Sequence, residues 1–107
     1  DAERAAGALL AAGVGAALIT LGENGVLYRD ARQTVHVPAF NAGPVVETTG
    51  AGDAFNGGFA AALVRGLDPI AAVRFGCATA GISVTRPGTA PSMPSLAEIE
   101  RLLGQGA

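Results

Sequence analysis

The sequence predicts an α/β fold whose sheet is incomplete within these residues. Residues 2–12 are strong helix formers that end at Gly13, and residues 16–21 form a short apolar run typical of a strand covered on both faces. A glycine-rich turn at residues 50–52 then leads into an apolar helical segment. A helix followed closely by a buried strand is half of a βαβ unit, so we expect a preceding strand and a longer parent domain.

Turn residues predict a hairpin after the first strand. Residues 22–25 (GENG) have the composition of a turn, and two short apolar runs follow at residues 26–29 and 34–37. Residues 30–33 would connect them. Residues 45–46 are expected to form a brief extended piece before the glycine-rich turn.

Capping signals predict three helices in the second half of the chain. They are expected at residues 53–65, at residues 69–84 and after Ser95. Asp68 has the position of an N-cap, with Pro69 as the first helical residue. Ser95 and Glu98 have the spacing of a capping box, in which each side chain bonds the other's amide.

Charge and composition exclude several kinds of partner. The net charge is −2 and the seven basic residues are all arginines, so no basic patch for nucleic acid is expected. The lone Cys77 excludes an internal disulfide and a cysteine-based zinc cluster, which is compatible with a cytoplasmic location. Residues 5–22 are uncharged, but they are mostly Ala and Gly, so no membrane span is predicted.

The glycine-rich turn is the candidate for chemistry. Gly50 and Gly52 allow the backbone to approach a bulky ligand, and the helix that follows adds the positive end of its dipole. Backbone amides in such a turn form an anion hole suited to a phosphate. Asp53 has two interpretations, as a simple N-cap of this helix or as a general base. The spacing leaves both open.

A wider set of motifs resembles the ribokinase family of carbohydrate kinases, the PfkB group. The segment ETTGAGDAFNGG (residues 47–58) is similar to the family signature, usually written DTTGAGDxF, and TLGENG (residues 20–25) to its nucleotide-binding turn. Arg74-Phe75 and VTRPG (residues 84–88) followed by Pro91-Ser92 resemble ribokinases themselves. The resemblance implies the C-terminal, nucleotide-binding part of a three-layer α/β/α domain, with the sugar-binding part and lid outside these 107 residues.

The resemblance also implies an activity, namely transfer of phosphate from ATP to a sugar hydroxymethyl group, with D-ribose as the sugar. The alternatives are fructokinase, 2-keto-3-deoxygluconate kinase or nucleoside kinase activity, or a fragment that binds nucleotide without catalysis. Asp53 would be the catalytic base, and Gly50, Ala51 and Gly52 would form the anion hole. The nucleotide would lie against Thr20, Gly22, Gly25, Gly52 and Cys77. Without the resemblance, a lone cysteine such as Cys77 is more often a small buried apolar residue than part of a binding site.

The family further implies Mg²⁺ with the ATP and an activating K⁺ ion. By resemblance, the K⁺ ligands would be Glu47, Thr49, the carbonyls of Ser83, Arg86 and Gly88, and Ser92. Glu47 departs from the family's usual Asp, which changes the reach of one carboxylate. We expect the full-length protein to be a cytoplasmic homodimer, and the 107-residue chain alone to be inactive. His36, the only histidine, is expected to have a surface or cross-strand role.

Overall fold

The structure is a computed structural model, and it describes residues 4, 7, 15–46, 48, 50–86 and 94–104. The described elements run along the chain as β1 (Ala16–Thr20), the 3₁₀ helix η1 (Gly22–Asn24), β2 (Val26–Asp30), β3 (Thr34–Val37), α2 (Ala51–Val64), α3 (Pro69–Ser83) and α4 (Leu96–Gly104). The α/β class is therefore confirmed. Residues 4 and 7 are helical, whereas the rest of the helix predicted at residues 2–12 lies outside the described residues.

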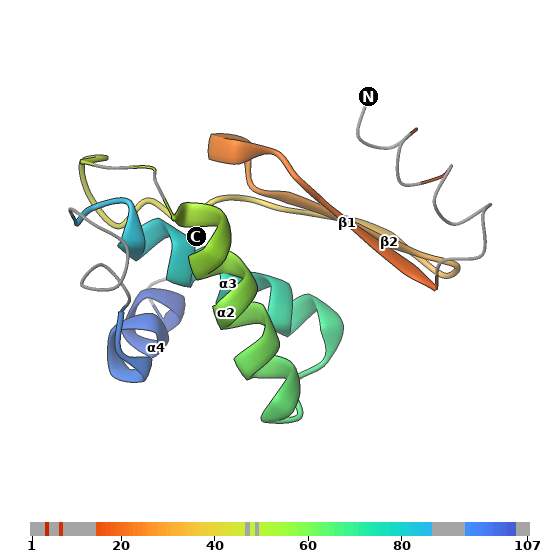
Figure 1. The fold of residues 1–107 in the computed structure, drawn as a ribbon. Helices are drawn as coiled ribbons and strands as arrows, with labels where there is room; N and C mark the ends of the chain where they lie inside the picture. Colours follow the sequence, from red (N-terminus) through yellow and green to blue (C-terminus); the bar gives the residue numbers. More distant parts are fainter. Residues whose placement is uncertain are drawn as a thin grey trace.

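The three strands form one antiparallel sheet in the order β1-β2-β3. The predicted hairpin is confirmed, because Asp30 donates its amide to the Gln33 carbonyl at 2.9 Å. The Asp30 carboxylate also accepts the amides of Arg32 and Gln33, at 2.8 and 3.0 Å. In Figure 1 the strands make a long twisted ribbon that projects beyond the helices beneath it.

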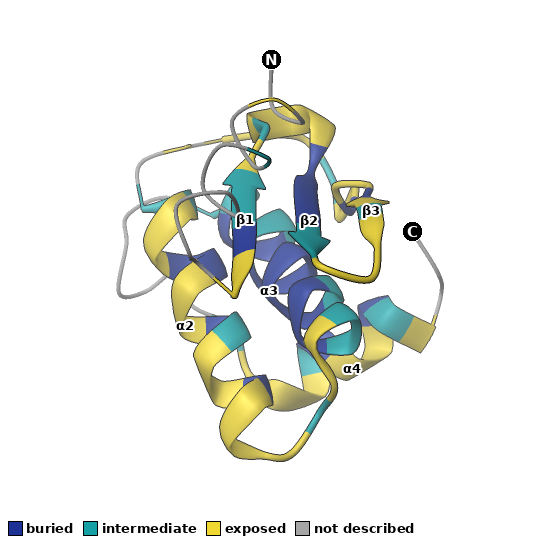
Figure 2. Cartoon of the chain, turned by 90° about the vertical axis from the view of Figure 1, so that its right-hand side faces the viewer, coloured by how far each residue is buried: buried dark blue, intermediate teal, exposed yellow. Residues whose placement is uncertain are grey.

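The first strand is less buried than the sequence predicts. Ala17 is buried, but Ala16 and Thr20 are exposed and the strand ends at Thr20 (Figure 2). Within the described residues β1 pairs with β2 alone, so it is an edge strand whose outer side has no neighbour. Residues 45–46, predicted as a brief extended piece, belong to no strand; both valines are exposed and lie in the loop before α2.

The core lies between the sheet and two tightly packed helices, α2 and α3. A Cβ atom on Gly58 of α2 would lie 2.3 Å from Oγ1 of Thr79 on α3. A Cβ atom on Gly76 of α3 would lie 2.9 Å from the Phe55 ring of α2. Such a close approach is possible only because both positions are glycine. Figure 2 shows α3 as the most buried element, behind the strands.

The predicted caps of α3 and α4 are confirmed. The Asp68 carboxylate accepts the Ala71 amide at 2.8 Å, with Pro69 as the first residue of α3. Ser95 and Glu98 form the reciprocal capping box, with distances of 2.9 and 3.3 Å. No helix in the described ranges is long and apolar enough to cross a membrane.

The start of α2 corrects one prediction. The helix begins at Ala51, two residues before the predicted start, and its N-cap is Gly50 rather than Asp53. Gly50 has a φ of 86°, a left-handed conformation that glycine adopts without a steric penalty. The helix can therefore start directly after the turn, which places Asp53 inside its first turn.

Candidate functional site

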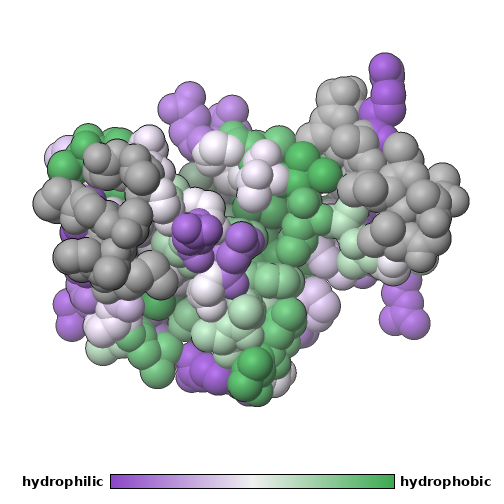
Figure 3. Space-filling model, viewed as in Figure 1, coloured by the Kyte–Doolittle hydropathy of each residue, from purple (hydrophilic) through white to green (hydrophobic). Residues whose placement is uncertain are grey.

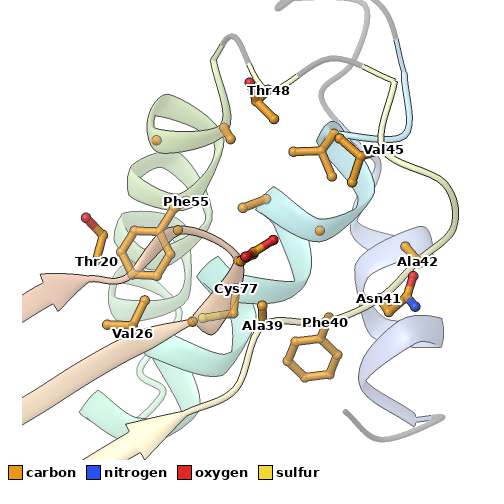
Figure 4. Close-up of a pocket in the computed structure, with 18 of the residues that line it drawn as sticks. Thr20, Val26, Ala39, Phe40, Asn41, Ala42, Val45, Thr48, Phe55 and Cys77 are labelled. Carbon is orange, nitrogen blue, oxygen red and sulfur yellow. The ribbon is translucent and has the colours of Figure 1, made fainter.

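A cavity of about 850 Å³ lies where four segments of the chain meet. Its wall comes from η1 and the adjoining strand ends, the loop after β3, the first turn of α2 and the second half of α3. In Figure 4, Thr20 and Phe55 lie on one side, Val45 on the other and Cys77 between them. The volume is that of a pocket for a small organic ligand.

The turn between β1 and β2 forms one wall and depends on two glycines. Gly22 and Gly25 have φ angles of 58° and 92°. The Leu21 amide donates to the Gly25 carbonyl at 2.8 Å, which closes the turn. A Cβ atom on Gly25 would lie 2.0 Å from the Val37 carbonyl oxygen, so only glycine fits there. Thr20, at the end of β1, also lines the cavity.

The first turn of α2 presents backbone amides at another wall. The Ala51 amide donates to the Thr48 carbonyl at 3.1 Å. The next two amides, of Gly52 and Asp53, belong to a helical first turn and therefore have no partner within the helix. Ala51 and Gly52 line the cavity, so the positive end of this 14-residue helix faces it. An anion can bind at such a helix end.

Asp53 lies in the same turn of α2 as the lining residues. It is exposed, and it does not itself line the cavity. Because the N-cap position belongs to Gly50, the carboxylate of Asp53 is not used to cap α2 in the predicted way. This arrangement leaves Asp53 beside the helix end where an anion would bind.

The opposite end of the cavity is apolar. Cys77 is 5% exposed, and burial raises the pKa of its thiol to about 11, while the positive charge of Arg74 acts in the other direction. The Arg74 guanidinium lies 5.5 Å from the centroid of the Phe40 ring. A Cβ atom on Gly81 would lie 2.6 Å from the Phe40 carbonyl oxygen, so the loop after β3 packs directly on α3. A flat, weakly polar group fits this end.

The structure brings together part of the site that the sequence predicts. The predicted residues that line this cavity are Thr20, Gly22, Gly25, Ala51, Gly52 and Cys77. Gly50 and Asp53 adjoin them in the chain. Ser83 and Arg86 lie at the end of α3 outside this lining, and the Ser83 carbonyl accepts the Arg86 amide at 3.1 Å. The other predicted cation ligands, Glu47, Thr49, Gly88 and Ser92, lie outside the described residues.

Sequence reasoning missed several residues of the wall. Among them are Glu23, Phe40, Asn41, Val45 and Gly81. Glu23 lies inside the predicted nucleotide-binding turn, so its place in the sequence could have identified it as a residue of the cavity wall. The loop residues carry no periodic pattern, and only the folded chain shows that they pack on α3.

Comparisons with known proteins agree on one family. Residues 1–96 match the pfkB family of carbohydrate kinases. The chain is 46% identical over 85 residues to the ribokinase of Bacillus subtilis, covering 79% of this chain and 29% of that protein. It is 41% identical over 99 residues to the deoxyribokinase of Salmonella typhi, covering 92% of this chain and 32% of that protein. The chain thus spans about a third of the length of these relatives.

A solved structure of a relative agrees with the fold. The ribokinase of Arabidopsis thaliana, complexed with ribose and ATP, superposes with a TM-score of 0.89 at 33% identity. The match covers 94% of this chain and 33% of that one. The fold is therefore ribokinase-like, and the predicted resemblance is confirmed. The chain belongs to the pfkB family of carbohydrate kinases.

Proposed function

We propose that the protein transfers the γ-phosphoryl group of ATP to a sugar hydroxymethyl oxygen, and that D-ribose is the sugar. In this proposal the chain is the C-terminal, nucleotide-binding part of the kinase domain. The support is family membership, identity to a ribokinase, and a relative complexed with ribose and ATP. Identity to a deoxyribokinase makes deoxyribose the main competing substrate. A homodimer and a cytoplasmic location remain predictions.

The observation that carries the proposal is the start of α2. The left-handed Gly50 lets the amides of the first turn face the cavity, and Asp53 lies in the same turn. In the proposed reaction these amides hold the transferring phosphoryl group. Asp53 takes the proton as the hydroxymethyl oxygen attacks the γ-phosphorus and the bond to the bridging oxygen of ADP breaks. Amides fixed in place before the reaction stabilise the charge that develops on the phosphoryl oxygens.

The rest of the cavity suits the rest of a nucleotide. The glycines of the turn, Gly22 and Gly25, would lie beside the phosphates and ribose, together with Thr20. The apolar end, near Cys77 and Phe40, would hold the adenine ring. The nucleotide would thus run from the helix end of α2 to the second half of α3.

Two cations belong to the proposal. Mg²⁺ would accompany ATP and neutralise phosphate charge during transfer. For K⁺, Ser83 and Arg86 lie at the carbonyl end of α3, where the helix dipole is negative and favours a cation. Their carbonyls would join the oxygens of the four predicted ligands that lie outside the described residues. Equal activity in potassium and choline chloride would contradict the K⁺ site.

Asp53→Asn in the natural full-length protein tests the function. The substitution removes the base but hardly changes the shape, so kcat should fall by about 10²- to 10⁴-fold while the Kd for ATP stays nearly constant. Ribose-dependent ADP release and calorimetric titration measure the two quantities. The comparison of ribose, deoxyribose, fructose, 2-keto-3-deoxygluconate and adenosine as acceptors should give the highest kcat/KM for ribose.

Asp68→Asn is the matched control. Asp68 caps α3 away from the cavity, and asparagine caps a helix equally well, so activity should not change. If Asp53→Asn kept more than a tenth of the wild-type turnover, Asp53 would not be the base. Catalysis would then have to be assigned elsewhere, or the protein would be a nucleotide-binding protein only.

A further inference from the structure

His36 ties the strand β3 to the turn that lines the cavity. Its Nε2 atom lies 2.6 Å from the carbonyl oxygen of Asn24, twelve positions earlier in the chain. A carbonyl oxygen only accepts hydrogen bonds, so the imidazole is the donor. His36 lies on the exposed face of β3, and its side chain does not line the cavity. It can therefore act on a ligand only through the turn.

Three kinds of contact hold the turn, and His36 contributes a side-chain hydrogen bond to it. Internal backbone bonds close it, between Leu21 and Gly25 at 2.8 Å and between Gly25 and Gly22 at 3.1 Å. Gly25 also lies directly against the Val37 carbonyl of β3. The imidazole then fixes the carbonyl of Asn24, the residue between the lining residues Glu23 and Gly25. A change at His36 would thus loosen the turn without removing any group from the cavity.

We propose that His36 is a positioning residue for the nucleotide. By holding the Asn24 carbonyl, it keeps the turn in the shape that the phosphates and ribose of ATP require. Without this bond, the turn samples more conformations when empty, and binding must order it again at a cost in affinity. The effect falls on ATP and not on the sugar or on the transfer step. The inference rests on the proposed nucleotide-binding function of the cavity.

His36→Phe and His36→Gln in the natural full-length protein test the inference. Phenylalanine keeps a planar ring suited to a strand but removes the donor. Because the bond is exposed, its loss should raise the KM and Kd for ATP about two- to fivefold, with kcat and the sugar KM unchanged. Glutamine places an amide nitrogen near the Nε2 position and should restore ATP affinity. Hydrogen exchange of the peptide covering residues 21–26 should be faster in His36→Phe than in the wild type.

Thr34→Val is the matched control. Thr34 lies two residues earlier on the same face of β3 and belongs neither to the turn nor to the cavity wall. It should leave every constant unchanged. Wild-type ATP affinity in His36→Phe, or equal losses in the phenylalanine and glutamine variants, would overturn the inference alone. A wild-type protein that neither binds ATP nor consumes it would overturn the proposed function, and the inference with it.

Discussion

At the scale of single residues, Cys77 shows how burial controls chemistry in the cavity. The side chain is 5% exposed, and desolvation of the thiolate raises its pKa from 9.0 to about 11, against the opposing charge of Arg74. The neutral thiol is therefore favoured in the folded state. The contribution of the protonated Cys77 thiol to the free energy of unfolding is present below pH 9 and is lost as the pH rises towards 11.

We predict that Cys77 reacts slowly with iodoacetamide until the pH is high. A pKa shift of two units lowers the thiolate fraction at pH 8 by about a hundredfold relative to the unfolded chain. Mass spectrometry of the peptide that contains Cys77 measures the labelling rate in native and urea-unfolded protein. The native rate should rise steeply between pH 9 and 11, and ATP should lower it further. Fast native labelling at pH 8 would show that the thiol is not buried in solution.

Residue chemistry at the glycine-rich turn was only partly readable from the sequence. The motif directed attention to Ala51 and Gly52, and the structure places both in the lining of the cavity. It wrongly offered Asp53 as an N-cap. The left-handed conformation of Gly50 lets the helix begin two residues before the predicted start. Glycine can adopt either sign of φ, so the sequence alone does not show which conformation the fold selects.

At the scale of elements, the contact between α2 and α3 depends on the absence of side chains. Gly58→Ala would place a Cβ atom 2.3 Å from Thr79 Oγ1, while the Thr79 hydroxyl donates to the Phe75 carbonyl at 2.8 Å. We predict that this substitution destabilises the protein by about 1–3 kcal/mol, since the helices must move apart. Urea denaturation of the natural full-length protein measures the change.

Two further variants isolate the steric cause. Gly52 lies in the same helix, but a Cβ atom at this position would have open space around it. The Gly52→Ala substitution should therefore not lower the free energy of unfolding. Thr79→Ala removes the nearest atom, and the double variant with Gly58→Ala should lose less stability than the sum of the single changes. If the losses of stability in Gly58→Ala and Thr79→Ala simply added, the two residues would not be in contact.

Elements set by neighbouring residues were predictable, and those set by distant contacts were not. The hairpin at Asp30 and the caps at Asp68 and Ser95 were read correctly because each depends on side-chain bonds within a few positions. The burial of β1 was not, because it depends on which elements pack against the strand. Val46 also donates its amide to the Val84 carbonyl at 2.7 Å. A hydrogen bond between residues so far apart in the chain cannot be predicted from a local sequence pattern.

At the scale of the whole molecule, large apolar side chains remain at the surface. Val64 is 89% exposed and Leu63 is 42% exposed, both at the end of α2, where Figure 3 shows hydrophobic surface in the lower part of the view. Exposed apolar patches usually mark surfaces that contact other protein. The chain spans about a third of the length of its relatives, and we expect these residues to pack against parts of the domain outside the chain.

We therefore predict that the 107-residue chain alone does not phosphorylate ribose, even if it binds ATP. Phosphoryl transfer depends on holding the acceptor hydroxyl in line with the γ-phosphate, and an acceptor left free in solution loses that advantage, about 7–11 kcal/mol of barrier at most. Ribose-dependent ADP release should be absent for the chain and present for the natural full-length protein. Circular dichroism must first show that the chain is folded, so that unfolding is not mistaken for the missing sugar contacts. If the folded chain turned ribose over within tenfold of the full-length rate, these residues would hold a complete sugar site.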